Sequence, residues 1–160
     1  MPLFEVKELD RKIYREELED FLPQQMIDIH THVWLSALRR RTKPISRRVT
    51  WPSLVARDNS VEDLQETYRL MFPGKKVTPL IFASTERETI EPCNAYVREA
   101  AGKTGFPALY YARPEETADE LERKIREGGY VGIKSYLDLS PSYIPEAEVR
   151  IFDFFPKHQL

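Results

Sequence analysis

The chain has 160 residues, which is enough for one domain with a hydrophobic core, and its basic and acidic residues nearly balance to a formal net charge of −2. This balance argues against nucleic acid or an acidic membrane surface as a general partner. The single cysteine, Cys93, excludes an internal disulfide and is typical of a reducing compartment. Without a membrane-spanning apolar run or a secretory leader, a cytoplasmic protein with no membrane partner is expected.

The first predicted element is an amphipathic helix over residues 8–21, which Pro23 ends. Its apolar residues near one face are Leu9, Ile13, Leu18 and Phe21. We assign residues 1–24 to this N-terminal helical segment. The next stretch, from Met26 to Trp34, alternates apolar and polar residues, which predicts a β-strand.

That strand carries the run Asp28-Ile29-His30-Thr31-His32, with two of the three histidines of the chain. Because residues two apart on a strand share a face, Asp28, His30 and His32 are expected on one side. The other side, with Ile27, Ile29, Thr31 and Val33, is expected to pack on the core. Two imidazoles on one face predict a metal site at His30 and His32, with a pair of solvated histidines as the alternative. Asp28 either orients a ligand from behind or joins an interior hydrogen-bond network.

A basic loop rich in proline follows this strand, with its arginines between Arg39 and Arg48. The loop either caps a site and attracts an acidic substrate or is a solvated surface segment. Trp34, at the start of the loop, either packs the loop against the site as a cap or simply buries apolar surface area. Arg39 and Trp34 are therefore candidate substrate-binding residues.

The rest of the sequence alternates predicted helices and strands. A capping pattern at Ser60 and Asp63 starts a helix that ends at Pro73-Gly74. Further helices are predicted over 91–101, with Gly102 as the stop, over 115–127 and from about 147 to 155. Strands are predicted over 77–83, 106–112 and 130–137. This alternation is typical of a parallel α/β sheet with helices outside.

The first-strand run, together with Gly128-Gly129-Tyr130-Val131-Gly132-Ile133-Lys134-Ser135-Tyr136 at the fourth strand, resembles the amidohydrolase-2 family of the amidohydrolase superfamily. The resemblance implies a (β/α)8 TIM barrel, of which residues 25–160 form the first half, about four parallel strands truncated before strand five. It also implies a metal-dependent hydrolase or decarboxylase acting on a small carboxylate, lactone or amide. Zinc or manganese would be held partly by His30 and His32.

The remaining family ligands and the general base lie on later strands, so the catalytic base is unknown. The chain is accordingly expected to be an N-terminal fragment that is inactive alone and that self-associates or pairs with the missing half. His158, the third histidine, is not expected to be a ligand.

Two residues of the predicted fourth strand are candidates for substrate binding. Lys134 either contacts a substrate carboxylate, extends past the strand end to solvent, or is a carboxylated lysine that bridges metals, as in some members of the wider superfamily. Tyr136, on the same face, either lines the same pocket or packs in the core.

Two other functions remain open from the sequence. One is a non-catalytic α/β module that binds anions or nucleic acid through the Arg39–Arg48 loop. The other is a complete, doubly wound α/β domain with no catalysis.

Overall fold

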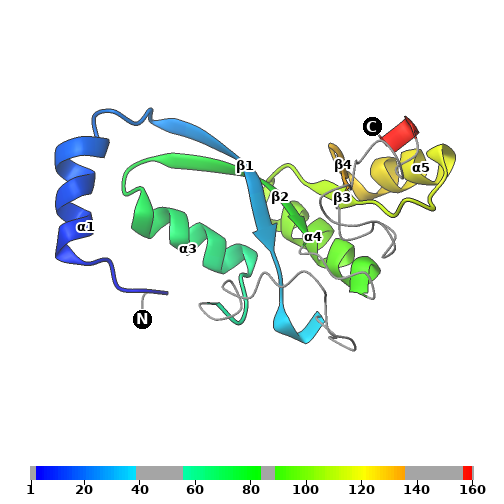
Figure 1. Cartoon of the computed structure of the whole chain (residues 1–160), viewed down its shortest axis with the longest axis horizontal. Helices are drawn as coiled ribbons and strands as arrows, with labels where there is room; N and C mark the ends of the chain where they lie inside the picture. The colour runs from blue at the N-terminus through cyan, green and yellow to red at the C-terminus, as the bar shows by residue number, and fades with distance from the viewer. Residues whose placement is uncertain (1–2, 39–55, 84–88, 136–156, 160) are drawn as a thin grey trace, which may run out of the picture.

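The computed structural model describes residues 3–38, 56–83, 89–135 and 157–159 (Figure 1). The Arg39–Arg48 loop, Tyr136 and the helix predicted near 147–155 lie outside the described residues. The helices are α1 (Glu8–Ile13), the π-helical turn η1 (Tyr14–Leu18), the 3-10 turn η2 (Ser36–Leu38), α3 (Val61–Met71), α4 (Ile90–Thr104), α5 (Ala118–Gly128) and the 3-10 turn η6 (Lys157–Gln159). The strands are β1 (Gln25–Val33), β2 (Lys76–Ala83), β3 (Leu109–Tyr111) and β4 (Gly132–Lys134).

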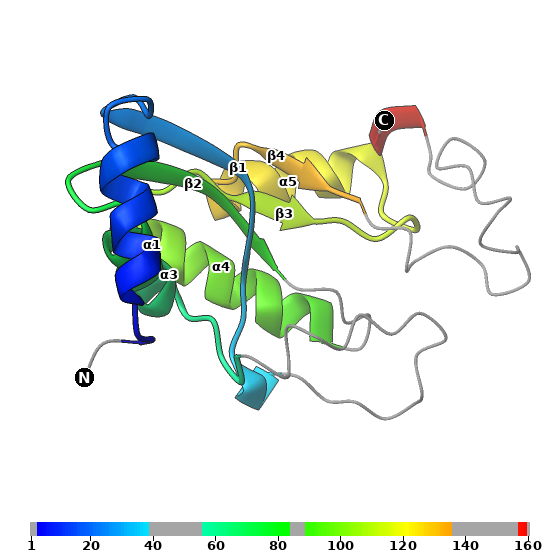
Figure 2. The same cartoon turned by 60° about the vertical axis from the view of Figure 1, so that its left-hand side comes forward.

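The chain is α/β, with parallel strand pairs joined through helices. β1 pairs with β2 from Gln25↔Lys76 to Val33↔Ala83, and β3 pairs with β4 from Leu109↔Gly132 to Tyr111↔Lys134. A single parallel bridge between Ile81 and Ala108 connects the two pairs, supported by a 2.9 Å bond from the Ile81 N–H to the carbonyl oxygen of Pro107. The four strands therefore neighbour one another in sequence order, with α4 packed against β2 and β3 (Figure 2).

The main core lies where α3 and α4 meet the strands. It combines Val33 from β1, Leu64 from α3, Ile81 from β2 and Val97 from α4, all buried. A smaller cluster joins β3 to α5 through Tyr110 and Leu121. Near this cluster the Lys124 ammonium donates to the Glu116 carboxylate at 2.6 Å and to the Tyr110 hydroxyl at 2.8 Å, and burial raises the pKa of Tyr110 to about 12.

Local sequence signals explain most of the helix boundaries. Ser60 caps α3 by accepting from the Asp63 N–H at 3.0 Å, as the capping pattern predicts, and Thr117 caps α5 in the same way. The predicted stop of α4 at Gly102 was wrong. The helix continues to Thr104 because Gly105, with a φ of 73°, is the residue in the left-handed conformation that ends it.

The N-terminal helix forms as predicted from Glu8, although its second half is a π-helical turn and the described helix ends at Leu18. Its apolar residues Leu9, Ile13, Leu18 and Phe21 are exposed. Among the described residues no helix has the length and apolar composition needed to cross a bilayer.

Candidate metal centre

The two histidines of the first-strand run lie side by side near the carboxyl end of β1. Their ring centroids are 5.3 Å apart, and the ring planes are tilted by 47°. Both rings rest against the same neighbour, Phe82 of β2, with centroid separations of 5.3 Å for His30 and 4.7 Å for His32. His32 is the cross-strand partner of Phe82, so the sheet register itself brings these rings together.

The hydrogen bonds of His32 select which of its ring nitrogens would bind a metal. Its Nδ1 lies 3.1 Å from the carbonyl oxygen of Ala83. Because a carbonyl oxygen only accepts, this contact requires the proton on Nδ1 and makes Nε2 the metal-binding nitrogen. The backbone is also fixed here, since the Asn59 side chain donates to the His32 carbonyl oxygen at 2.7 Å.

Asp28 does not share the face of the histidines, which corrects the expectation from strict alternation. Its carboxylate accepts from the Tyr68 hydroxyl of α3 at 2.7 Å, and the Thr31 hydroxyl lies 3.3 Å from the same Tyr68 oxygen. Asp28 nevertheless contacts the histidine segment, because it accepts from the His30 backbone N–H at 3.0 Å. It therefore positions His30 through the main chain.

A β-bulge explains this change of face. Asp28 pairs with Pro79 but Thr31 pairs with Ile81, so β1 contains one more residue than β2 over this interval. An extra residue inverts the alternation of side chains on either side of it. Asp28 consequently lies on the face of Thr31, towards α3.

The same bulge overturns the expected packing of the apolar side of β1. Thr31 and Val33 are buried as predicted, but Ile27 and Ile29 are 75% and 74% exposed. Ile27 pairs with Thr78, four residues from Phe82 on β2, so it lies on the face of His32 and not on the face of Val33. The face that carries the histidines is thus apolar towards the start of β1.

The pKa of Asp28 is set by two opposing influences. Partial burial raises it, but the bonds from the His30 N–H and the Tyr68 hydroxyl stabilise the carboxylate and bring the net pKa below its ordinary value. Burial and the adjacent Asp28 raise the pKa of Tyr68 above its ordinary range, so this hydroxyl remains a proton donor at neutral pH.

Lys134 joins the histidines at the same end of the sheet. It is the last residue of β4, and its Nζ lies 5.0 Å from the centroid of the Phe82 ring, within cation–π distance. The carboxyl ends of parallel strands meet at one edge of a sheet. At this edge β1 places the two histidines, β2 places Phe82 and β4 places Lys134. His30, His32 and Lys134 therefore surround Phe82.

The other predicted site residues do not join this cluster in the described structure. The Trp34 indole N–H donates to the carbonyl oxygen of Arg57 at 3.2 Å, and the Trp34 backbone bridges to Asn59. His158 lies against α5, where its Nε2 is 2.9 Å from the Glu116 carbonyl oxygen. Arg39 and Tyr136 lie outside the described residues.

The spacing of the two imidazole rings is compatible with one shared metal ion, but the donor set is incomplete. Two imidazoles on one tetrahedral zinc, each with a Zn–N bond of about 2.0–2.1 Å, place their ring centroids about 5 Å apart, which matches the observed separation. Within the described ranges, however, no group of three or more His, Cys, Asp or Glu side chains is positioned to hold an ion. A stable centre would need at least one further ligand.

Sequence reasoning missed Phe82 and Tyr68 as parts of this site. Phe82 falls in the strand predicted over 77–83 and Tyr68 in the helix predicted after Ser60, but nothing in either pattern marks them as site residues. The cross-strand position of Phe82 follows from the register, so the alternating run of β1 and the apolar run of β2 could have located it once they were aligned.

No family model, curated protein or solved structure matches the chain. The resemblance to the amidohydrolase-2 family therefore rests only on the sequence residues quoted for it.

Proposed function

We propose that this chain supplies the first four strands of a (β/α)8 barrel that acts as a metal-dependent hydrolase or decarboxylase. The observation that carries the proposal is the convergence of His30, His32 and Lys134 on Phe82 at the carboxyl end of the strands. Barrel enzymes of this type build their active sites at that end. The four parallel strands also neighbour one another in chain order, as consecutive strands of a barrel wall do, which supports the proposal.

The exposed apolar residues on one face of β1 favour a closed barrel rather than an open sheet. Ile27 and Ile29 lie on the face of His32, below the proposed metal position. Branched apolar residues of this kind fill the interior of a closed barrel in layers. We propose that further strands cover these side chains and supply the missing ligand, whether they come from the same polypeptide or from a second copy.

Each residue of the cluster has a definite role in this proposal. Zinc, or manganese as the alternative, would supply an acidified water or polarise a substrate carbonyl. His30 and His32 would hold the ion, the latter through Nε2, while Asp28 fixes the backbone of His30. Lys134 would bind a carboxylate of the substrate, which belongs to the class of small carboxylates, lactones or amides. No general base is assigned among the described residues.

Metal binding by the purified chain tests the proposal. Equilibrium dialysis against zinc, followed by elemental analysis, is expected to show one ion per chain at saturating zinc, with the weak affinity of a site that has two imidazole ligands. His30→Ala and His32→Ala are each expected to weaken this binding, and the double variant is expected to abolish it. His158→Ala is the matched control, since it removes the third imidazole, which lies in η6, and is expected to leave binding unchanged.

Two results would contradict the assignment. One is stoichiometric zinc in the double variant, and the other is equal loss of zinc in His158→Ala. Circular dichroism of each variant distinguishes loss of the site from loss of the fold.

A further inference from the structure

The exposed large apolar side chains of the described chain are concentrated in the N-terminal segment, residues 3–21. It carries six of the ten large apolar side chains that are exposed there, namely Leu3, Phe4, Leu9, Ile13, Leu18 and Phe21. Leu9 and Phe21 are 65% and 81% exposed. Because soluble proteins rarely leave contiguous apolar patches open, this concentration indicates a contact surface.

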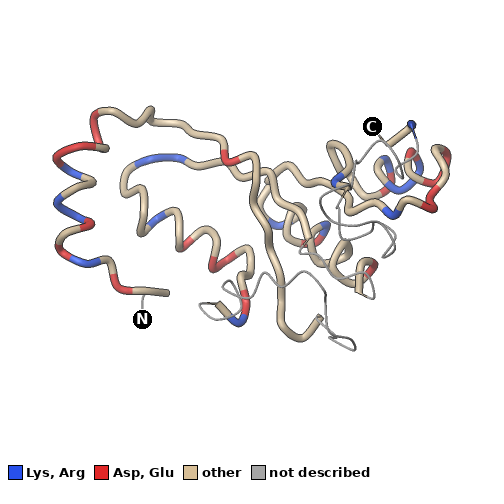
Figure 3. Tube along the Cα trace, in the orientation of Figure 1, with Lys and Arg blue, Asp and Glu red and all other residues tan. Residues whose placement is uncertain are grey.

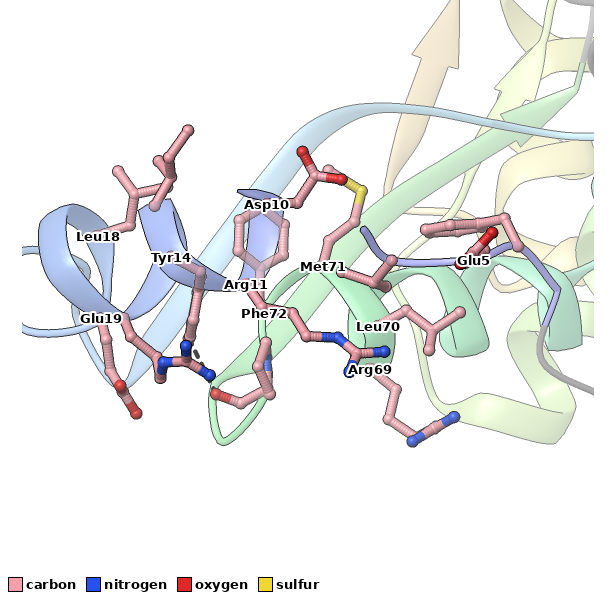
Figure 4. Close-up of a pocket in the computed structure, with 15 residues that line it drawn as sticks. Glu5, Asp10, Arg11, Tyr14, Leu18, Glu19, Arg69, Leu70, Met71 and Phe72 are labelled. Carbon is pink, nitrogen blue, oxygen red and sulfur yellow. Dashed lines mark hydrogen bonds between the residues drawn. The ribbon is translucent and has the colours of Figure 1, made fainter. Parts of the chain in front are cut away.

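An apolar groove of about 800 Å³ lies between this segment and the carboxyl end of α3 (Figure 4). The apolar residues of its two walls are Ile13, Tyr14 and Leu18 from the segment, and Leu70, Met71 and Phe72 from the end of α3. The segment is held in place beside the groove. The Tyr14 hydroxyl donates to the Pro73 carbonyl oxygen at 2.9 Å, and the Lys75 ammonium donates to the carbonyl oxygens of Glu19 and Leu22.

The two halves of the segment differ in net charge (Figure 3). From Leu3 to Arg15 there are four basic and three acidic residues, a net charge of +1. From Glu16 to Asp20 there are four acidic residues and no basic one, a net charge of −4. Acidic residues at the carboxyl end of a helix oppose its macrodipole, so this half gains from a basic partner.

We infer that this segment is a dimerisation surface, which pairs antiparallel with the same segment of a second copy of the chain. In such a pair the basic half of each copy lies against the acidic half of the other. A two-fold axis makes both contacts at once, as isologous interfaces require. The exposed apolar residues between the charged positions would be covered in the same contact, and the groove beside them would receive part of the partner segment.

A second copy is the occupant that these observations favour. A partner of uniform charge would match only one half of the segment, whereas an inverted copy matches both. The inference is independent of the proposed metal chemistry, since the segment does not include His30, His32 or Lys134.

Two charge-reversal variants test this pairing, with sedimentation equilibrium as the measurement. Glu16→Lys with Glu17→Lys brings the acidic half to zero net charge, and Arg11→Glu with Lys12→Glu makes both halves acidic. The wild-type chain is expected to dimerise. Each variant alone is expected to dimerise about tenfold or more weakly, because the first variant loses the charge that attracts the basic half and in the second variant like charges face each other. An equimolar mixture of the two variants is expected to form a heterodimer tighter than either homodimer, because the basic half of the first variant then faces the acidic half of the second, and this heterodimer should weaken with added salt.

A matched control uses the same change of charge on α5. Glu122→Lys with Glu127→Lys alters two exposed acidic residues there and is expected to leave dimerisation unchanged. A monomeric wild-type chain would overturn the inference. It would also be overturned if either variant dimerised as well as the wild type, or if folded variants remained monomeric when mixed. Circular dichroism of each variant confirms that the helices are retained.

Discussion

The β2–α4 region and the N-terminal region of this chain differ in how completely they are packed. Ile81, Ile90 and Val97 are fully buried between β2, α4 and β3. Ile27 and Ile29 of β1, and Phe21 before it, remain largely exposed. Both regions have the hydrophobic periodicity expected of their elements. Periodicity therefore predicts which element forms, but burial depends on a partner that covers its apolar side.

The largest expected effect comes from removing the same side-chain atoms in the two regions. Ile81→Ala in β2 should lower the free energy of unfolding by about 2–5 kcal/mol, because it leaves a cavity in the core. Ile29→Ala in β1 should change it by no more than about 0.5 kcal/mol, because its side chain already contacts solvent. Urea unfolding followed by circular dichroism measures both.

The contrast between these two variants also tests whether β1 is covered in solution. Should Ile29→Ala prove as destabilising as Ile81→Ala, the histidine-bearing face of β1 would be buried by a second copy of the chain. Repeating the titration at several protein concentrations separates this case, since a stability that depends on association rises with concentration.

Most elements of the fold could be predicted from the sequence because their signals are local. Ser60 with Asp63 sets the start of α3 where the sequence predicted it. The same capping pattern, Thr117 with Glu120, starts α5 at Ala118, three residues after the predicted start at 115, because this second pattern was not recognised in the sequence. The alternation of helices and strands was sufficient to predict parallel pairing. The stop of α4 was predicted at the wrong glycine, because both Gly102 and Gly105 are suitable and only the backbone conformation distinguishes them.

The candidate site was predictable only in part. His30, His32 and Lys134 were identified from residue type and position, and the structure brings them around one ring. Asp28 was predicted on the face of the histidines but lies on the opposite face of β1. The β-bulge that causes this depends on the pairing of two strands, so neither strand's sequence alone predicts it. Tyr68 reaches Asp28 from 40 residues away, a contact that periodicity does not predict.

Two asparagines, Asn94, which is buried, and Asn59, which is half-buried, extend the comparison of the two regions to hydrogen bonding. The Asn94 side chain of α4 makes two bonds to the backbone of Tyr111, whereas Asn59 makes one, to the carbonyl oxygen of His32. Asn94→Ala should lower the free energy of unfolding by about 2–4 kcal/mol, because it leaves the buried N–H and carbonyl oxygen of Tyr111 without these hydrogen bonds. Asn59→Ala should cost about 1 kcal/mol. Equal losses in urea titrations would show that the β1 end is as tightly enclosed as β3.

The smallest expected effect concerns Tyr68, which joins the packed α3 to the open strand β1. Tyr68→Phe removes the hydroxyl that donates to the Asp28 carboxylate, and should lower the free energy of unfolding at pH 7 by about 1–2 kcal/mol. The pKa of Asp28 is lowered in the folded chain, so its stabilising contribution is complete above the ordinary carboxyl pKa of about 4. That contribution is lost as the pH falls through the lowered pKa.

The difference between Tyr68→Phe and the wild type should therefore narrow below about pH 4. Tyr96→Phe is the matched control, because its hydroxyl accepts from the Val61 N–H and bonds no carboxylate among the residues that the structure describes. Its effect on the free energy of unfolding should remain constant over the same pH range. A parallel pH dependence in both variants would mean that the bond from Tyr68 does not lower the pKa of Asp28. The bond from the His30 N–H would then account for the lowered pKa of Asp28 without Tyr68.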